Sequence, residues 1–311
     1  MSGIAHWDAV EGRRRAAGHL GAEWFDLGTA AGTDTVGLQR IKIAPGAWST
    51  PAHIEHGEEE IFWVLAGSGL SWQDAGDGPT THAVGPGDCL VHRMMAEAHT
   101  LHAGEDGLDV LAFGQRTRSG GARLPRAGLS WLGPSWVRSG DPPAPWEGEA
   151  LASAPELPAP SARPASIVNL GAVAGDRRDG ATVARERRDL GTAAGSATTG
   201  LKHIRVDEGK LAAPPHCHSA EEELFVVLEG EGMLVLGDQE HPVRAGTIVA
   251  RSAGTGVAHT VCAGTGGLAL LAYGTREAND ICYYPRSGKV ALWGVGVIGR
   301  IEPVDYWDGE D

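Results

Sequence analysis

Two matching segments of the chain, residues 36–43 (VGLQRIKI) and 199–206 (TGLKHIRV), alternate apolar and polar side chains. An apolar residue at every second position is the pattern of a strand that turns one face toward a core. Two further runs, 60–65 (EIFWVL) and 223–228 (ELFVVL), are rich in the β-branched and aromatic residues that strands favour. The pattern predicts strands in both halves of the chain and little helix.

Glycines and prolines divide these runs. We expect the runs at 60–65 and 223–228 to stop at Gly67 and Gly230, and residues 232–238 to form a hairpin with the strand before them. The chain holds 46 glycines and 18 prolines. Short strands punctuated in this way are typical of an all-β sandwich or barrel.

The chain also repeats itself. Residues 27–69 align without gaps with residues 190–232, and nearly half of the aligned residues are identical. Near the end of each half, residues 107–116 (GLDVLAFGQR) match residues 267–276 (GLALLAYGTR). A repeat of this length indicates a duplicated domain, because solenoid units have periods of about 20–50 residues. We therefore predict two tandem antiparallel jelly-roll barrels.

A proline-rich segment separates the two copies. Residues 138–164 place prolines among small and acidic residues, and we interpret them as an extended linker without a packed element. Trp146 and Leu151 are the linker residues most suited to lie along a domain surface. The N-terminal domain then covers residues 1–137 and the C-terminal domain residues 165–311, each of about 150 residues and long enough for its own core.

The charge of the chain excludes some partners. Lys and Arg number 26 against 40 Asp and Glu, which gives a net charge of −14. Such a surface repels nucleic-acid phosphates and anionic lipid, so we expect neither nucleic acid nor a membrane as a partner. No apolar run reaches the roughly 18 residues of a membrane span, and the N-terminal residues do not resemble a secretory signal. The four scattered cysteines form no disulfide framework, which favours reduced thiols and a cytoplasmic location.

A cluster of histidines and one glutamate stands out in the C-terminal half. His216 and His218 lie two apart on a strand and so point to the same face, while Cys217 between them points the other way. Glu223 opens the next strand, and a partner strand can bring His259 alongside. Three imidazoles and one carboxylate suit a divalent transition metal and leave coordination positions open. Structural zinc more typically recruits C-x-x-C pairs, which the sequence lacks.

These residues resemble the two conserved motifs of the cupin superfamily, and the duplication makes the chain resemble a bicupin. The first motif is matched by Gly209, His216, His218, Glu223 and Gly230, and the second by Gly246, Gly256 and His259. The sequence departs from the motifs by one extra residue after Gly209 and by Ser252 near the expected proline. The resemblance implies a barrel with a metal at its centre, often iron, manganese, nickel or zinc. Cupin chemistry is so varied that the fold does not select a reaction.

The N-terminal copy departs from the motif. His53, Glu60 and His99 match the corresponding C-terminal residues, but Glu55 stands where the pattern has His218. Either Glu55 is a ligand and the site has two histidines and two carboxylates, or this barrel has lost its metal and keeps a structural or binding role. We expect the N-terminal site to be absent or weaker than the C-terminal one.

Other polar and apolar features receive simpler interpretations. The acidic pairs at 58–59 and 221–222 are interpreted as solvated turns. Arg116 and Arg276 occupy matching positions, which favours a structural role shared by the two domains. The tail at 281–311 is rich in aromatic residues and glycine. We expect it to pack on a barrel or on a partner, and we therefore expect a homo-oligomer, most simply a dimer.

The first functional hypothesis is an enzyme. The four C-terminal candidate ligands would hold a metal with open positions, and an apolar wall formed by Leu224, Val226 and Leu228 or their inward neighbours would exclude water. A dioxygenase-type oxidoreductase acting on a small organic substrate is the leading reaction class. A metal-dependent lyase, decarboxylase or isomerase needs the same ligands. A non-catalytic bicupin that binds a sugar or a carboxylate is the remaining alternative. No general base beyond the ligands can be identified from the sequence.

Overall fold

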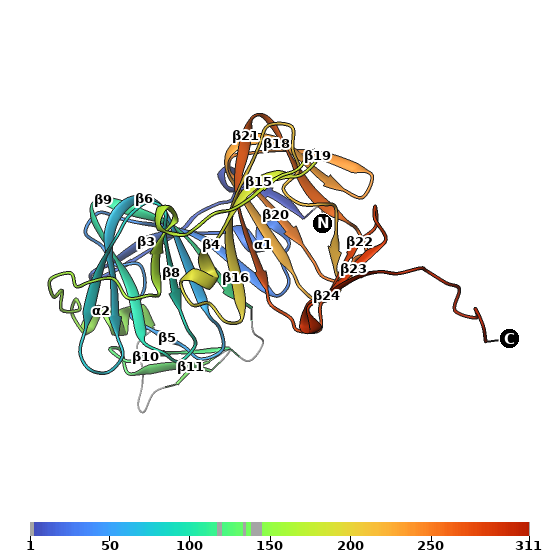
Figure 1. The fold of residues 1–311 in the computed structure, drawn as a ribbon. Coiled ribbons are helices and arrows are strands. Elements are labelled where there is room, and N and C mark those ends of the chain that lie inside the picture. Colours follow the sequence, from blue (N-terminus) through green and yellow to red (C-terminus); the bar gives the residue numbers. More distant parts are fainter. Residues whose placement is uncertain (1–2, 117–119, 133–134, 138–144, 311) are drawn as a thin grey trace.

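The computed structural model describes residues 3–116, 120–132, 135–137 and 145–310, and shows two β-barrels side by side (Figure 1). Three short α-helices occur in the described residues, α1 (Leu27–Ala31), α2 (Pro145–Leu151) and α3 (Leu190–Ala193), besides three single-turn 3₁₀-helices. All pairs between strands are antiparallel. The prediction of two tandem antiparallel jelly-roll barrels is confirmed. No described helix has the length and apolar character needed to cross a membrane.

Each barrel combines an eight-stranded and a four-stranded sheet. The large N-terminal sheet has the order β13–β8–β6–β9–β4–β3–β2, with β7 added to β6, and the small one has the order β12–β11–β10–β5. The large sheet consists of β2 (Arg13–Ala17), β3 (Leu20–Asp26), β4 (Val36–Ile43), β6 (Glu60–Asp74), β7 (Thr80–Val84), β8 (Asp88–His92), β9 (Ala98–Gln115) and β13 (Ile167–Asn169). The small sheet consists of β5 (Ile54–Glu55), β10 (Gly121–Leu124), β11 (Leu129–Leu132) and β12 (Ser135–Val137).

The C-terminal barrel repeats this plan. Its large sheet has the order β1–β20–β18–β21–β16–β15–β14, with β19 added to β18, and its small sheet has the order β17–β22–β23–β24. The large sheet consists of β1 (Ile4–His6), β14 (Asp176–Asp179), β15 (Ala184–Asp189), β16 (Thr199–Val206), β18 (Glu223–Leu236), β19 (Gln239–Arg244), β20 (Thr247–Arg251) and β21 (His259–Thr275). The small sheet consists of β17 (Cys217–His218), β22 (Ile281–Tyr284), β23 (Lys289–Leu292) and β24 (Val297–Arg300).

Strands β4 and β16 have the bounds that the alternating pattern predicts. Each strand, however, buries one face along its first half and the opposite face along its second half. Ile41 and Ile43 point into the core of the N-terminal barrel, whereas Val36 and Leu38 belong to a cluster shared with the other barrel. The apolar positions change face midway along the strand, because its first half lies against the neighbouring barrel. The expectation of a single buried face is therefore wrong for the first half of the strand.

The two long strands β6 and β18 continue past the glycines at which we expected them to stop. Their pairing shifts register around Gly67 and Gly230, and both glycines have positive φ, +81° and +78°. A side chain there would collide with the carbonyl oxygen of Gly107 or Gly267, so the glycines permit a bulge. The predicted hairpin at 232–238 is wrong, since residues 232–236 extend β18 and pair with both β19 and β21, and residues 237–238 form the turn into β19.

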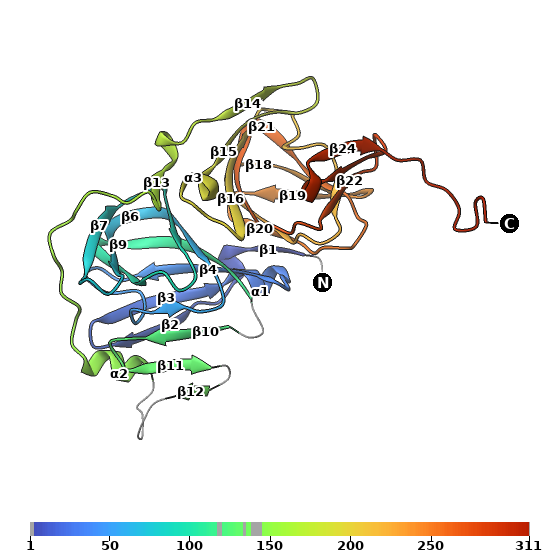
Figure 2. The ribbon, with the colours of Figure 1, turned by 60° about the horizontal axis from the view of Figure 1, so that its bottom comes forward.

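The two halves of the chain exchange a strand. β1, from the start of the chain, pairs with β20 in the C-terminal sheet, and β13, which follows the proline-rich segment, pairs with β8 in the N-terminal sheet (Figure 2). Each large sheet therefore includes a strand from the other half. A cut between residues 138 and 164 would not yield two complete sheets, and the domain boundaries at 137 and 165 stay a prediction.

Glu59 and Glu222 fasten the barrels to each other. Their exposed fractions are only 3% and 2%, so their interpretation as solvated residues is wrong. The Glu222 carboxylate accepts hydrogen bonds from the backbone of the N-terminal half, and Glu59 does the same toward the C-terminal half. The donors to Glu222 are the amides of Asp34, Thr35 and Val36, at 2.9, 2.6 and 3.0 Å, with the Thr35 hydroxyl at 2.6 Å. The donors to Glu59 are the Ser196 and Thr199 hydroxyls and the Ala197 amide, at 2.6, 2.9 and 3.0 Å.

The proline-rich segment is more structured than we expected. Its helix α2 places the Trp146 ring edge-on against Trp24, with centroids 5.1 Å apart, so the prediction that no element forms there is wrong. Leu151 is exposed, and residues 138–144 lie outside the described residues. At the other end of the chain, residues 302–310 extend away from the second barrel with Tyr306 and Trp307 exposed (Figure 1). This last part of the tail does not pack on a barrel of its own chain.

Candidate metal centre

The structure brings together the four C-terminal residues that the sequence singles out. Glu223 Oε2 lies 2.9 Å from His259 Nε2, 3.3 Å from His218 Nε2 and 3.8 Å from His216 Nε2. Three imidazoles therefore aim the same ring nitrogen at one carboxylate oxygen. His216, Glu223 and His259 have donor atoms within 4.8 Å of one another.

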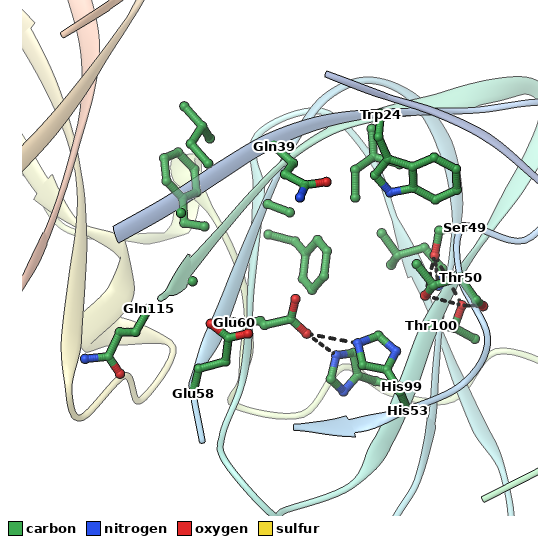
Figure 3. A pocket seen from close by; sticks show the side chains of 18 of the residues that line it. Trp24, Gln39, Ser49, Thr50, His53, Glu58, Glu60, His99, Thr100 and Gln115 are labelled. Carbon is green, nitrogen blue, oxygen red and sulfur yellow. Dashed lines mark hydrogen bonds and ion pairs between the residues drawn. The ribbon is translucent and has the colours of Figure 1, made fainter. Parts of the chain in front are cut away.

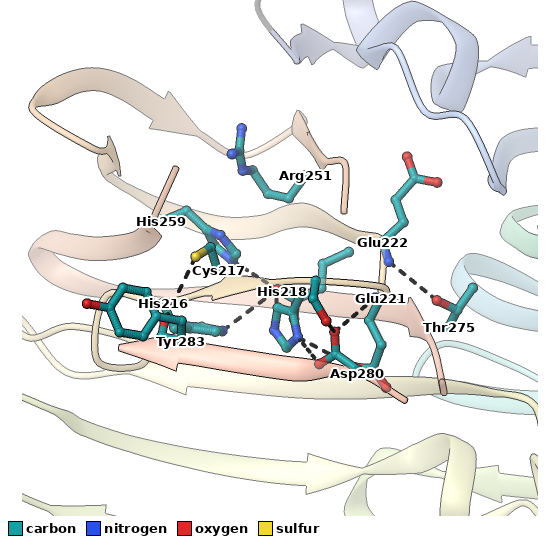
Figure 4. A network of polar contacts seen from close by, with 12 residues as sticks. His216, Cys217, His218, Glu221, Glu222, Arg251, His259, Thr275, Asp280 and Tyr283 are labelled. Atoms are coloured by element: carbon teal, nitrogen blue, oxygen red, sulfur yellow. Dashed lines mark hydrogen bonds and ion pairs between the residues drawn. The ribbon is translucent and has the colours of Figure 1, made fainter. Parts of the chain in front are cut away.

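Local strand geometry produces this convergence. His216 and His259 form an isolated antiparallel bridge, with backbone N–H···O distances of 3.2 and 2.8 Å, while Glu223 is the first residue of β18. His218 belongs to the two-residue strand β17. Cys217 faces away from the imidazoles, with Sγ 4.0 Å from the Tyr283 carbonyl oxygen, as alternation along a strand predicts (Figure 4).

The imidazoles are oriented as metal ligands require. His216 donates from Nδ1 to the Pro214 carbonyl at 2.8 Å, and His218 donates from Nδ1 to Asp280 Oδ2 at 2.7 Å. Because Nδ1 is occupied in both rings, Nε2 is the nitrogen that a metal can take once it is deprotonated, and Nε2 faces Glu223. His218 Nε2 is buried and has no hydrogen-bond partner among the described residues. Three imidazole nitrogens converge on one carboxylate oxygen, and these are donors that divalent transition metals take, so the donor set fits a divalent metal.

The N-terminal barrel gathers three of its four candidates around one oxygen. Glu60 Oε2 lies 2.8 Å from His99 Nε2 and 3.2 Å from His53 Nε2 (Figure 3). Glu55 sits farther out, with Oε1 3.6 Å from His53 Nε2. His53 repeats the orientation of His216 by bonding from Nδ1 to the Pro51 carbonyl at 2.9 Å.

A cavity adjoins each cluster, and the two cavities differ in their walls. The C-terminal one, of about 380 Å³, is lined by the cationic side chains of Arg187 and Lys202. The N-terminal one, of about 410 Å³, has Trp24 and Gln39 at the corresponding positions. The remaining N-terminal lining is largely apolar and includes Ile41, Phe62, Leu101 and Trp131.

Comparison with known proteins assigns the chain to a family. Two segments, residues 39–111 and 202–272, match the model of the cupin domain, one in each barrel. The chain is a bicupin of the cupin superfamily. No curated protein sequence matches this bicupin.

Solved structures resemble the bicupin over most of its length. Oxalate decarboxylase from Bacillus subtilis at pH 4.6 aligns at 13% identity with a TM-score of 0.58, over 87% of this chain and 75% of that one. The formate complex of the Lactobacillus farciminis oxalate decarboxylase aligns at 11% identity with a TM-score of 0.59, over 88% and 86%. A third structure, of the Bacillus subtilis oxalate decarboxylase, comes from work on the Mn(II) centers of that enzyme. It aligns at 12% identity with a TM-score of 0.58, over 89% of this chain and 78% of that one. At these identities the likeness shows a shared fold.

Sequence reasoning missed Asp280, which positions a candidate ligand of the bicupin. Its side chain is fully buried; Oδ2 accepts from His218, and Oδ1 accepts from the amides of Ala220 and Glu221 at 2.9 and 3.2 Å. The matching N-terminal residue is Gly120, because both copies keep the same shift as residues 107–116 and 267–276. An aspartate opposite a glycine in the repeat is the signal that was available.

The charges of the C-terminal centre are set by one buried carboxylate among three imidazoles. Burial opposes the charge on Glu223, but the imidazoles of His218 and His259 outweigh it and hold the pKa of this carboxyl well below its usual range. Burial also opposes charge on His218, but Glu223 and Asp280 raise its pKa to about 9. Burial lowers the pKa of His216 to about 4. Glu223 is thus an anion at neutral pH and is balanced by the protonated His218, so a metal ion that binds here must displace the His218 proton.

The N-terminal centre carries a surplus of carboxylates. Burial, together with the charge of Glu60, raises the pKa of Glu55 to about 7. Burial opposes charge on His53, yet Glu60 and Glu55 raise its pKa to about 9, and burial lowers the pKa of His99 to about 4. The His99 ring also stacks on His92, with centroids 4.0 Å apart. This centre has no counterpart of the Asp280 carboxylate.

The apolar wall that we expected around the site is formed by other residues of the same strand. Leu224 and Val226 face the other barrel, and Leu228 packs against that same interdomain cluster, so these three do not form the site wall. Their inward neighbours, which the expectation named as the alternative, do point into the barrel: these are Phe225 and Val227, and the Phe225 ring lies 5.6 Å from the ring of His259.

The shared structural role of the paired arginines is confirmed. Arg116 donates to the Thr29 hydroxyl of α1, and Arg276 donates to the Thr192 hydroxyl of α3, both at 2.8 Å. Each arginine therefore holds a short helix against its own barrel.

Proposed function

We propose that this bicupin holds a divalent metal ion in its C-terminal barrel and acts as a lyase that removes CO₂ from a small carboxylate. One observation carries the proposal: a complete set of three histidines and a glutamate adjoins a 380 Å³ cavity that also presents Arg187 and Lys202. The structural resemblance to oxalate decarboxylases, one of them described for its Mn(II) centers, supports a decarboxylation over the dioxygenase reaction expected from the sequence.

The metal would be held by His216, His218, Glu223 and His259, and would supply a Lewis acid that polarises a carboxylate oxygen. Lys202 has no ion-pair partner among the described residues, and its ammonium group is free to attract an anionic substrate. Arg187 lies 3.0 Å from Asp176 Oδ2 and adds a second cation at the cavity wall. The site thus selects small anions.

Decarboxylation breaks the bond between the carboxylate carbon and its neighbour. CO₂ leaves, the electron pair stays on the neighbouring carbon, and that carbon takes up one proton, so no oxidant is consumed. The cavity contains one carboxyl group, Glu221, that is neither a proposed ligand nor paired with an arginine. Its Oε1 accepts from the Glu277 amide at 3.0 Å, which leaves Oε2 to carry the proton. We assign proton delivery to Glu221.

The decisive experiment measures CO₂ and O₂ together. Protein loaded with Mn²⁺ is incubated with small dicarboxylates and keto acids, and we expect CO₂ release without net O₂ consumption. Glu221→Gln should abolish turnover and retain the metal, while the matched N-terminal variant Glu58→Gln should leave turnover unchanged. Stoichiometric O₂ consumption would instead identify a dioxygenase. Full metal occupancy with bound but unchanged carboxylate would identify a binding protein.

We also propose that the bicupin forms a homodimer through its C-terminal apolar surface. Residues on β24 and in the tail beyond it are exposed, among them Val297, Ile298, Ile301, Tyr306 and Trp307. β24 is also the last strand of its sheet and leaves its outer edge unpaired in the described residues. Light scattering tests this surface: we expect a dimer mass for the full chain and a monomer mass after removal of residues 297–311.

A further inference from the structure

A buried thiol lies beside the C-terminal centre. Cys282 pairs in register with His218 across strands β17 and β22, so the two side chains stand on the same face of the sheet. Cys282 is 1% exposed and lines the cavity that opens beside the candidate ligands. Its Sγ and one ring nitrogen each of His216 and His218 lie within 4.8 Å of one another.

A second observation points to a ligand at this position. The His218 side chain is only 9% exposed, and its Nε2 makes no hydrogen bond of good geometry in the described residues, its contact being Glu223 Oε2 at 3.3 Å. Because Asp280 occupies Nδ1, Nε2 is the nitrogen left to bind a cation. His216 belongs to two overlapping triads, one completed by Glu223 and His259 and the other by His218 and Cys282.

We propose that His216, His218 and Cys282 form a second cation-binding set that takes a thiophilic divalent ion such as Zn²⁺, Cd²⁺ or Co²⁺. The proposal rests on the proposed metal centre, since the two sets share His216 and His218. The set completed by the Glu223 carboxylate takes harder ions than the set completed by the Cys282 thiolate, so the two sets of this centre prefer different ions. The thiol releases its proton to solvent as the sulfur–metal bond forms.

The geometry is close to what such an ion needs. Zinc binds thiolate at about 2.3 Å and imidazole nitrogen at about 2.0–2.1 Å, which places its donors roughly 3–4 Å apart. The three donors here all lie within 4.8 Å of one another, close to that spacing. The cavity leaves a fourth position open to solvent or to a substrate. Because the sets share two histidines, an ion in the thiolate set excludes a second ion from the carboxylate set. Thiophilic metals are then competitive inhibitors of Mn²⁺ loading.

The N-terminal barrel provides an internal control. Ala122 stands where Cys282 does, and Glu55 stands where His218 does. We therefore expect a sulfur-bound ion in the C-terminal barrel only. A thiolate signal that disappears when Cys282 is replaced reports on the C-terminal centre alone.

The experiment uses Cd²⁺ as the probe. Titration of the metal-free full chain should produce a thiolate-to-cadmium charge-transfer band in the ultraviolet, which saturates at one equivalent and is accompanied by release of a proton. Cys282→Ala should lose the band and still bind Mn²⁺, as followed by electron paramagnetic resonance. Cys217→Ala, which removes the neighbouring thiol on the opposite face, and Cys262→Ala should both retain the band.

The outcomes separate this proposal from the proposed function. Cd²⁺ binding without a sulfur band, or a band that persists in Cys282→Ala, overturns the thiolate set and leaves the Mn²⁺ centre standing. A parent protein that binds neither Mn²⁺ nor Cd²⁺ overturns both. Cadmium-113 resonance of the unaltered protein tests for the sulfur ligand without a variant, because a sulfur ligand shifts the signal far from that of nitrogen and oxygen ligands.

Discussion

The two barrels keep the same strand order and the same three donors, a histidine, a glutamate and a histidine, but they differ at the fourth donor and in the wall behind it. The C-terminal residues that differ are Arg187, Lys202, His218 and Asp280, and the N-terminal residues in their places are Trp24, Gln39, Glu55 and Gly120. All of these side chains lie in or beside the cavities, away from the cluster that joins the barrels. The duplicated fold thus tolerates a complete change of chemistry at a few inward positions.

The difference is mainly electrostatic. Exchange of an imidazole for a carboxylate leaves the N-terminal centre with both Glu55 and Glu60, and burial together with the charge of Glu60 raises the pKa of Glu55. The C-terminal centre has one carboxylate among three imidazoles and stays positive once it holds a divalent ion. Under the proposed function, an anionic substrate would therefore be attracted to the C-terminal centre more strongly than to the N-terminal one.

The largest expected effect separates the two centres directly. His216→Ala should remove metal from the C-terminal barrel and abolish turnover, because a metal ligand is lost. The matched variant His53→Ala should retain most of the C-terminal metal and most of the turnover. Elemental analysis and circular dichroism check metal content and fold. Undiminished metal in His216→Ala would show that the ion lies elsewhere.

Asp280→Asn tests the carboxylate that orients His218, which has no counterpart in the described residues of the N-terminal centre. The amide keeps the shape of the side chain but not its charge, so the affinity for Mn²⁺ should fall by about 10–100-fold. Isothermal titration of the metal-free protein measures this loss. Glu97→Gln, which alters the carboxylate 2.8 Å from His92 in the N-terminal barrel, is the control and should leave the C-terminal affinity unchanged. Equal losses in both variants would contradict the proposed role of Asp280.

Lys202→Gln gives the C-terminal cavity the residue that the N-terminal one carries. We expect KM for a carboxylate substrate to rise about tenfold, or about 1.4 kcal/mol, with kcat and metal content nearly unchanged. Steady-state kinetics measures KM and kcat separately. A fall in kcat at constant KM would mean that Lys202 acts on the transition state and does not attract the substrate.

Glu55→His restores the missing imidazole to the N-terminal barrel and has the smallest expected effect. Metal occupancy of that barrel should rise toward one equivalent, because the repulsion between the two carboxylates disappears. Metal analysis in the His216→Ala background isolates this barrel from its neighbour. Full N-terminal occupancy before the substitution would contradict a deficit caused by Glu55.

Much of the centre could be predicted from the sequence because its residues follow local rules. His216 and His218 are fixed on one face by the period of a strand, and the repeat places Glu223 and Glu60 at equivalent strand starts. The bounds of β4 and β16 follow from the same periodicity. Such patterns state which positions are buried but not what covers them, so the second buried face of β4 could not be foreseen.

Residues that act across long sequence distances escaped prediction. Asp280 lies in no motif and meets His218 only because β22 pairs with β17. Glu59 and Glu222 each follow another acidic residue, which locally indicates a solvated turn, yet their partners come from the opposite half of the chain. No periodicity reports contacts of this kind, since they depend on how the two barrels dock.

The exchange of β1 and β13 has a consequence for the history of the duplication. Had the copies remained separate modules, a copy whose chemistry lapsed could be deleted without harm to its sibling. Here deletion of either half would strip an outer strand from the survivor's sheet. The strand exchange therefore gives a structural reason to keep both copies, whichever of the two cavities is in use.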